Sequence, residues 1–277
     1  MAGTLYIVGT PIGNLGDFSP RGAQTLGSVD FIAAEDTRVT IKLLNHFDIK
    51  KPMISYFEHN KLERGEQIIR RLEAGESCAL VTDAGMPVFS DPGEELVALC
   101  HERGIAVTVI PGPCAAVSAI AISGLPSGRF CFEGFLSVSK KPRREHLKSI
   151  ADEERTLVFY EAPHKLKNTL ADLYKVLGDR RIAITRELTK IHEEVINTTL
   201  LQATALYEVE APRGEFVLIV EGKKAAAAKV SDSNDGAIKA AELASRYIGE
   251  GMSHSAAVKR AAQETGASRS EIYRLTL

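Results

Sequence analysis

Short apolar runs alternate with amphipathic helical patterns over the first 125 residues, and no other feature of the sequence constrains the fold as strongly. The apolar runs cover residues 5–8, 29–34, 53–57, 78–81 and 105–110. Helical patterns lie between them, at residues 38–47, 62–72 and 94–101. Buried parallel strands appear as continuous apolar runs, and strands that alternate with helices form βαβ units. The alternation therefore predicts an N-terminal α/β domain with a parallel sheet, spanning residues 1–125.

The pattern changes after Gly124, Leu125 and Pro126, where strands become more closely spaced. Strands are expected at residues 130–136, 156–160, 182–186, 194–198 and 216–221. Helices are expected at residues 165–177 and 199–207. This mixture predicts a second α/β domain over residues 126–222, so the chain as a whole belongs to the α/β class.

The remaining residues differ in composition, because a segment of small and polar side chains is followed by helical patterns. Residues 223–236 have the composition of a flexible linker. Three helical patterns follow at 237–249, 253–265 and 268–276, separated by glycines, and Ser268 is a favourable N-cap. Helices joined by tight glycine-containing turns predict a helix-turn-helix-like module over residues 237–277. The alternative is a three-helix bundle that caps the fold or a dimer.

Composition excludes several classes of protein. The four cysteines are scattered without a C-x-x-C pair, so a zinc ribbon or a redox motif has no support. The first Lys or Arg is Arg21, and no apolar stretch approaches the ~20 residues of a membrane span, so a cytoplasmic protein is expected. The net charge of −2 combines +3 over residues 223–277 with −5 over the remainder. A mildly basic tail is compatible with RNA binding.

Four unusual loops follow predicted strands, at residues 9–17, 33–38, 82–93 and 111–116. Ligands of open α/β sheets bind at the carboxyl ends of the strands, where these loops lie. Neither a P-loop nor a G-x-G-x-x-G fingerprint occurs, and the loops contain few cations. They predict a pocket that is poor for a triphosphate but suits a ligand with an adenine, a ribose, an amino-acid end and a positive sulfonium.

Two of these loops carry acidic residues with alternative roles. Glu35, Asp36 and Arg38 directly follow an apolar strand and suit the polar floor of an active site. Alternatively, Asp36 caps the next helix. Asp91, with Pro92 at the first helical position, is expected to cap the helix near residue 94.

The same loops carry a family resemblance that extends over nearly the whole chain. Seven segments occur in order: LYIVGTPIGNLGD, AAEDTR, VTDAGMPVFSDPG, VIPGPCA, FYEAPHKL, RELTKIHEE and RGEFVLIVEG. They resemble the ribosomal RNA small-subunit methyltransferase I family, a branch of the tetrapyrrole-methylase-like methyltransferases. Tetrapyrrole-modifying members have Gly-Asp-Pro where this chain has the sequence Asp83-Ala84-Gly85-Met86-Pro87, which favours the RNA branch.

This resemblance implies a fold, a cofactor and a reaction. The expected fold has two α/β domains with S-adenosyl-L-methionine in the cleft between them, usually in a homodimer. The expected reaction methylates the ribose 2′-hydroxyl of a cytidine in the decoding centre (P site) of 16S rRNA, in the small ribosomal subunit. Two alternatives are a tetrapyrrole (precorrin-type) methyltransferase and a non-catalytic nucleic-acid-binding regulator.

The resemblance assigns residues to the cofactor site, and the chain's own charged residues are candidates for the other roles. Those expected to bind the cofactor are Pro11, Asp83, Ala84, Gly85, Val88, Cys114, Ala115, Glu161, Leu188 and Glu215. Asp36 and Glu35 are candidates for a general base, and Arg38 is expected to hold them or an RNA phosphate. Expected RNA contacts are Lys140, Lys141, Arg143, Arg144, Arg269 and Arg274. No metal is expected, because a sulfonium is already a strong methyl donor and His192 lacks the second His of H-E-x-x-H.

Overall fold

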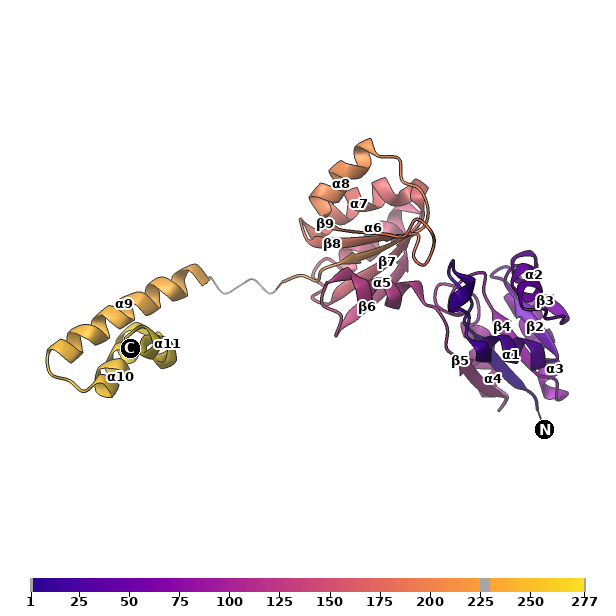
Figure 1. The fold of residues 1–277 in the computed structure, drawn as a ribbon, viewed down its shortest axis with the longest axis horizontal. Helices are drawn as coiled ribbons and strands as arrows, with labels where there is room; N and C mark the ends of the chain where they lie inside the picture. Colours follow the sequence, from indigo (N-terminus) through magenta and orange to yellow (C-terminus); the bar gives the residue numbers. More distant parts are fainter. Residues whose placement is uncertain (1, 225–229, 277) are drawn as a thin grey trace. The chain divides into compact units, whose positions relative to one another are not determined.

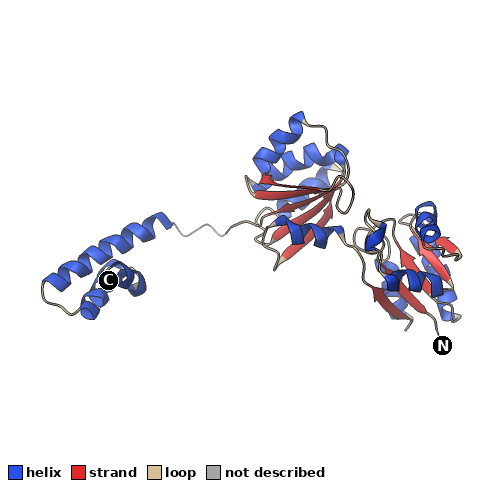
Figure 2. Cartoon of the chain, in the orientation of Figure 1, coloured by secondary structure: helices blue, strands red, loops and turns tan. Residues whose placement is uncertain are grey.

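The computed structural model of the protein describes residues 2–224 and 230–276, with side chains for residues 2–224 and 238–276. The chain divides into two compact units, Met1–Lys223 and Lys224–Leu277. The first unit contains two sheets and the second contains helices, as the ribbon and its secondary structure show (Figures 1 and 2).

The first sheet is fully parallel, which confirms the sequence prediction. Its strands are β1 (Thr4–Val8), β2 (Phe31–Ala34), β3 (Met53–Ser55), β4 (Cys78–Val81) and β5 (Ala106–Ile110). They lie in the order β3-β2-β4-β1-β5, so β1 and β4 are central and the loops after them meet at the carboxyl edge.

Helices cover both faces of this sheet, which is why its inner strands β2 and β4 are apolar and buried throughout. One core contains side chains of α3 (Lys61–Glu73) and α4 (Glu94–Glu102), and the other contains side chains of α1 (Pro20–Ser28) and α2 (Thr37–His46). The sequence patterns did not predict α1, nor the 3-10 turn Leu15–Asp17 before it. The Ser19 hydroxyl caps α1 by accepting a hydrogen bond from the Gly22 N–H at 2.9 Å.

The predicted start of α4 is wrong. The helix begins at Glu94 with Gly93 as N-cap, not with Asp91, and no side chain caps it. Gly93 has a φ of +147°, a backbone conformation that L side chains rarely adopt. The chain therefore turns into the helix two residues later than expected, and the Asp91 carboxyl does not cap α4.

The second sheet is mixed, with parallel and antiparallel neighbours, a pairing that the sequence patterns did not specify. Its strands are β6 (Phe130–Phe135), β7 (Thr156–Glu161), β8 (Arg181–Arg186), β9 (Glu194–Thr199) and β10 (Phe216–Val220), in the order β6-β7-β10-β8-β9. Only β6 and β7 are parallel neighbours, and the other pairs are antiparallel. The β6–β7 pairing contains a register shift between Phe132 and Gly134.

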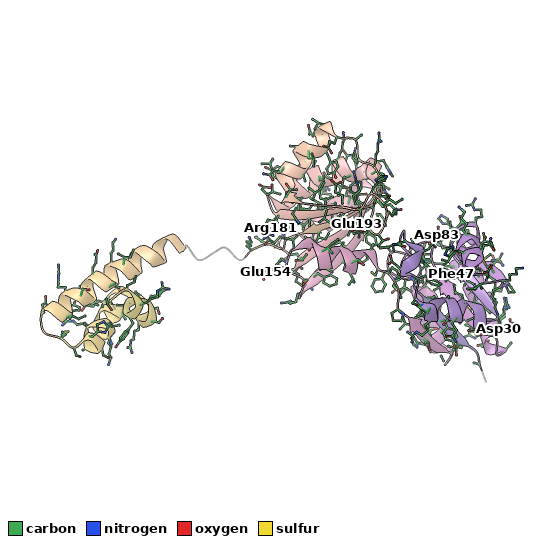
Figure 3. The ribbon with its side chains drawn as sticks, viewed as in Figure 1. Asp30, Phe47, Asp83, Glu154, Arg181 and Glu193 are labelled. Atoms are coloured by element: carbon green, nitrogen blue, oxygen red, sulfur yellow. The ribbon has the colours of Figure 1, made fainter. Side chains whose placement is uncertain are left out.

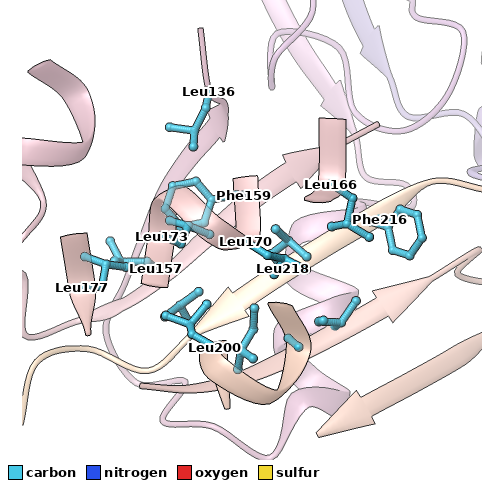
Figure 4. Close-up of a cluster of buried hydrophobic side chains, with 14 of the residues drawn as sticks. Leu136, Leu157, Phe159, Leu166, Leu170, Leu173, Leu177, Leu200, Phe216 and Leu218 are labelled. Atoms are coloured by element: carbon cyan, nitrogen blue, oxygen red, sulfur yellow. The ribbon is translucent and has the colours of Figure 1, made fainter. Parts of the chain in front are cut away.

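A leucine-rich core fills one face of the second sheet (Figure 4). It joins the strands to α6 (Lys140–Ser149), α7 (Pro163–Leu177) and α8 (Leu200–Val209). The opposite face packs against α5 (Ala115–Ser123), mainly through Ala116, Ala119 and Ile120. Helix α5 precedes the domain division predicted at residue 125 yet packs on the second sheet; that division stays a prediction.

The second unit consists of α9 (Val230–Gly249), α10 (His254–Thr265) and α11 (Arg269–Leu275). Its small core includes Ala244, Val258 and Ile272. Ser268 is the N-cap of α11, as expected. Because α9 begins at Val230, residues 230–236 of the predicted linker are helical, whereas residues 225–229 lie outside the described residues. No helix in the described part of the chain is long and apolar enough to cross a membrane.

Candidate active site

A cavity of about 560 Å³ lies at the carboxyl ends of the first sheet's strands, within Met1–Lys223. Its volume is in the range of small-molecule sites. The residues that line it are Ile12, Glu35, Thr82, Asp83, Ala84, Gly85, Met86, Phe89, Ser90, Asp91, Cys114, Ala115, Phe135, Tyr160, Glu161, Ala162, Pro163, His164, Leu188, Glu215, Phe216 and Val217. Loops after β1, β2, β4 and β5 thus meet residues of the second sheet.

The loop after β4 is held in place by backbone hydrogen bonds to the loop after β1. The Thr10 N–H donates to the Gly85 carbonyl at 2.8 Å, and the Gly85 N–H donates to the Thr10 carbonyl at 3.1 Å. Gly85 has a φ of +93°, which favours glycine. Val88 and Ser90 also have positive φ, at +80° and +67°. Such strain in non-glycine residues clusters at functional sites, so this loop has the character of a binding loop.

The cavity wall is acidic. Five carboxylates line it, and none of the described lining residues is Lys or Arg. Asp83 lies on the part of the chain that bears the first sheet (Figure 3), and desolvation raises its pKa. An acidic wall with apolar neighbours suits a cationic ligand and repels a polyphosphate.

Asp91, Glu35 and Thr82 form the polar core of this wall. The Thr82 hydroxyl donates a hydrogen bond to a Glu35 carboxylate oxygen at 2.6 Å. Desolvation raises the pKa of Asp91 to about 6, and the negative charges of Glu35 and Asp83 raise it further. A carboxyl group whose pKa lies near neutrality is suited to accept a proton in a reaction.

Asp36, in contrast, does not line the cavity. It is the N-cap of α2, and its carboxylate accepts hydrogen bonds from the Arg38 N–H at 2.8 Å and the Arg38 Nε at 3.0 Å. These hydrogen bonds hold the pKa of Asp36 at about 2. The Arg38 side chain is 87% exposed. The geometry therefore supports the capping alternative for Asp36. A carboxylate with so low a pKa is a weak base and would accelerate the reaction little as a proton acceptor.

Replacing Asp36 with alanine is therefore expected to affect stability more than chemistry. Loss of the cap should lower the melting temperature by roughly 2–4 °C. Asp36→Asn should retain most of this stability, because asparagine is also a good N-cap. Thermal unfolding followed by circular dichroism measures the difference. Equal destabilisation by both substitutions would show that the pairing with Arg38, and not the cap, matters.

The second sheet contributes residues that are fixed by their own hydrogen bonds. The Tyr160 hydroxyl accepts a hydrogen bond from the Ala116 N–H at 3.1 Å, and burial raises its pKa. Glu161 is buried and accepts hydrogen bonds from the Ala162 N–H at 2.8 Å and from the Thr169 hydroxyl. Lys190 pairs with Glu215 at 2.8 Å. This wall of the cavity is therefore largely preorganised.

Comparisons with known proteins place the chain in a family. A family model described as Tetrapyrrole (Corrin/Porphyrin) Methylases matches residues 4–204. A protein named Ribosomal RNA small subunit methyltransferase I, from Synechocystis sp., is 48% identical over 276 residues, covering 99% of this chain and 98% of the relative. The chain belongs to the ribosomal RNA small subunit methyltransferase I family. A member of this family from Thermotoga maritima is 47% identical over 222 residues, covering 80% of this chain and 100% of the relative.

Solved structures confirm the fold of this family member. The crystal structure of uroporphyrin-III C-methyl transferase from Thermus thermophilus, complexed with S-adenyl homocysteine, matches with a TM-score of 0.56 and 17% identity. The match covers 80% of this chain and 98% of that chain. At this identity the likeness concerns the fold alone, and it agrees with the predicted tetrapyrrole-methylase type with two α/β domains.

Most of the cofactor residues expected from the family resemblance meet in one cavity. Eight line it, namely Asp83, Ala84, Gly85, Cys114, Ala115, Glu161, Leu188 and Glu215. Pro11 and Val88 are not among the lining residues, and neither are Asp36 and Arg38 of the expected catalytic group. Glu35 does line the cavity. The roles of these residues stay predictions.

Sequence reasoning missed several lining residues, among them Asp91, Phe89, Phe135 and Tyr160. The sequence offered a signal for Asp91, because it lies in the same loop as Asp83 to Gly85, which were assigned to the cofactor site. Phe135 gave no such signal, because its direction depends on the register shift in β6.

The cationic residues expected to contact RNA differ in their availability. Lys140, Lys141 and Arg144 are exposed on α6, as are Arg269 and Arg274 on α11. Arg143 is 15% exposed and pairs with Asp172 at 2.7 Å and the Thr169 hydroxyl at 2.9 Å. Arg143 therefore joins α6 to α7, which is a structural role that the sequence did not predict.

No group of three or more potential metal-ligating side chains occurs among the residues that the structure describes.

Proposed function

We propose that this protein transfers a methyl group from S-adenosyl-L-methionine to the ribose 2′-hydroxyl of a cytidine in the P site of 16S rRNA. The observation that carries the proposal is the acidic cavity, which is built from the segments through which the chain resembles its family. Its relatives are named ribosomal RNA small subunit methyltransferase I, and the substrate is carried over from that name and family. The protein is expected to act in the cytoplasm, as a homodimer.

The residues of the cavity fit this cofactor. Carboxylates at Glu35, Asp83 and Asp91 suit its positive sulfonium and ammonium groups, whereas a triphosphate would be repelled. Gly85 lets the backbone approach a ligand closely. The N-terminal ends of α5 and α7 reach the cavity, where helix dipoles favour a carboxylate.

The chain's own residues then account for substrate alignment and proton removal. When bound, S-adenosylmethionine supplies an electrophilic methyl group. Holding the ribose hydroxyl in line with that group is worth on the order of 7–11 kcal/mol. Asp91 accepts the hydroxyl proton as the oxygen–carbon bond forms and the carbon–sulfur bond breaks, with the electron pair passing to sulfur. Glu35 and Thr82 fix the polar wall beside it through their 2.6 Å hydrogen bond.

The exposed cations supply RNA contacts outside the cavity. Lys140, Lys141 and Arg144 on α6 and Arg269 and Arg274 on α11 are available to phosphates. Such contacts make RNA affinity depend on salt concentration. Arg143 is not included, since it is engaged with α7.

Truncation after Gly222 tests the part played by the helical unit. All cavity residues precede residue 222, and the Thermotoga maritima relative is matched over its full length by 222 residues. The truncated protein should fold and retain cofactor affinity, measured by calorimetry. Its RNA affinity should fall and depend less steeply on salt, because the contacts of Arg269 and Arg274 are lost. Unchanged activity on small-subunit particles would exclude the helical unit from RNA docking.

The substrate class is tested with labelled S-adenosylmethionine. The protein is incubated with small ribosomal subunits that lack the modification, or with porphyrinoid precursors. Label should enter the RNA alone. Label in a porphyrinoid would support the tetrapyrrole alternative, and label in neither, with intact cofactor binding, would support a ligand-sensing regulator.

A further inference from the structure

Four aromatic rings form a continuous row at the cavity. Phe89 contacts Phe132 with ring centroids 6.5 Å apart, Phe132 contacts Tyr160 at 5.0 Å, and Tyr160 contacts Phe135 at 5.6 Å. The rings come from the loop after β4, from β6 and from β7. Phe89, Tyr160 and Phe135 all line the cavity, so the row forms one of its walls.

A β-bulge in β6 brings two of these rings to one face. Residues three apart on a regular strand point to opposite faces. Here Phe132 pairs with Val158 and Phe135 pairs with Tyr160, while the register shifts between Phe132 and Gly134. Val158 and Tyr160 share a face, so the extra residue in β6 places Phe132 and Phe135 on that same face. Bulges of this kind re-aim side chains and are frequent beside active sites.

The two ends of the row are open to solvent. Phe89 is 55% exposed and Phe135 is 53% exposed, although both rings are large and apolar. In contrast, the inner ring of Tyr160 is fixed by its hydrogen bond to the Ala116 N–H. The rings of Phe89 and Phe135 therefore present flat apolar faces at the edge of the cavity, where a ligand that enters would contact them.

We propose that Phe89 and Phe135 stack on the base of the target nucleotide, which is turned out of the RNA to bring its ribose to Asp91. The proposal rests on the function proposed above. Proteins that recognise single-stranded RNA stack its splayed-out bases on aromatic side chains, and enzymes that act on a base extrude the nucleotide from the stack. The adenine of the cofactor is the other planar group. It is better matched by the buried apolar part of the cavity at Leu188, Phe216 and Val217.

Leucine at both positions tests the stacking. Phe89→Leu/Phe135→Leu keeps apolar bulk but removes the rings. Two RNA oligonucleotides are compared, one with the target cytidine and one with an abasic site in its place. Wild-type protein should bind the first more tightly, by about 5–150-fold if stacking contributes as in other single-strand binders. The double variant should bind both equally, with unchanged affinity for S-adenosylhomocysteine by calorimetry.

Control measurements distinguish failure of the stacking proposal from failure of the proposed function. Phe57 is 37% exposed and does not line the cavity, so Phe57→Leu should behave as wild type. A double variant that loses S-adenosylhomocysteine affinity but still distinguishes the two RNAs would overturn the proposal and assign the rings to adenine. Equal binding of both RNAs by the wild type would overturn it as well. Base-dependent RNA binding without methyl transfer to small subunits would instead contradict the proposed function and leave the stacking supported.

Discussion

Replacement of Asp91 with asparagine should lower the rate of methyl transfer to small subunits by about 10²–10⁴-fold, the usual range for loss of a general base. Asparagine keeps the size of the side chain but cannot accept the proton. Cofactor affinity should change much less, because Glu35 and Asp83 remain in the acidic wall. Single-turnover rates and calorimetry of the same preparations measure both quantities.

The pH dependence provides a second readout of Asp91. Below a pH of about 6 the carboxyl is protonated and cannot act as a base, so kcat/KM for the methyl donor should rise with pH and level off above it. This rise should be absent in Asp91→Asn.

The raised pKa also means that the folded protein binds more protons than the unfolded chain between the ordinary aspartate pKa of 3.8 and about 6. Stability of the wild type should therefore fall relative to Asp91→Asn as pH rises through that window.

Asp36→Asn is the matched control, since it makes the same chemical change in a carboxylate outside the cavity. It should leave both the rate and the pH profile nearly unchanged. A large loss of rate in Asp36→Asn with a normal rate in Asp91→Asn would restore the sequence-based assignment of Asp36 as the base.

Gly85→Val should reduce S-adenosylmethionine affinity by at least about tenfold, from backbone strain of order 1–3 kcal/mol and loss of ligand space. A Cβ at Gly85 would lie 3.5 Å from Ile12 and 3.7 Å from the Pro113 carbonyl, so the protein itself has room for it. The strain arises from the φ of +93°, and the bulk enters the wall of the cavity. Affinity is measured by calorimetry and folding by thermal unfolding.

Gly104→Val provides the control for strain alone. Gly104 has a φ of +66° and does not line the cavity, and a Cβ at this position would meet no other atom within 4 Å. This substitution should cost stability without changing cofactor affinity. Equal loss of affinity in both variants would mean that the effect at Gly85 is general destabilisation, and unchanged affinity in Gly85→Val would remove this loop from the site.

The sequence predicted the strands well because hydrophobic burial dominates them. The inner strands β2 and β4 are apolar and buried throughout, as expected for parallel strands that are covered by helices on both faces. Helix α1 was missed because its sequence, PRGAQTLGS, contains two glycines and few apolar residues. It is held by the Ser19 cap and by packing of Leu26 against the sheet, and tertiary packing overrides weak propensity.

The residues of the site were predictable only in part, because tertiary structure, and not the local sequence, positions several of them. The loop residues Asp83 to Gly85 were assigned through family resemblance and lie in the cavity wall. Asp91 was misassigned because Asp-Pro-Gly is a good helix start locally, whereas the positive φ of Gly93 moves that start to Glu94. The inward direction of Phe135 follows from a bulge, which depends on pairing with β7 and leaves little trace in the local sequence.

The central claim is tested most directly by mapping ribose methylation along 16S rRNA from cells with and without this protein. The account predicts that a 2′-O-methyl group on one cytidine in the P site is absent without the protein and returns when it is restored. Restoration with Asp91→Asn should leave that position largely unmethylated. An identical 2′-O-methylation map in the two strains would contradict the account.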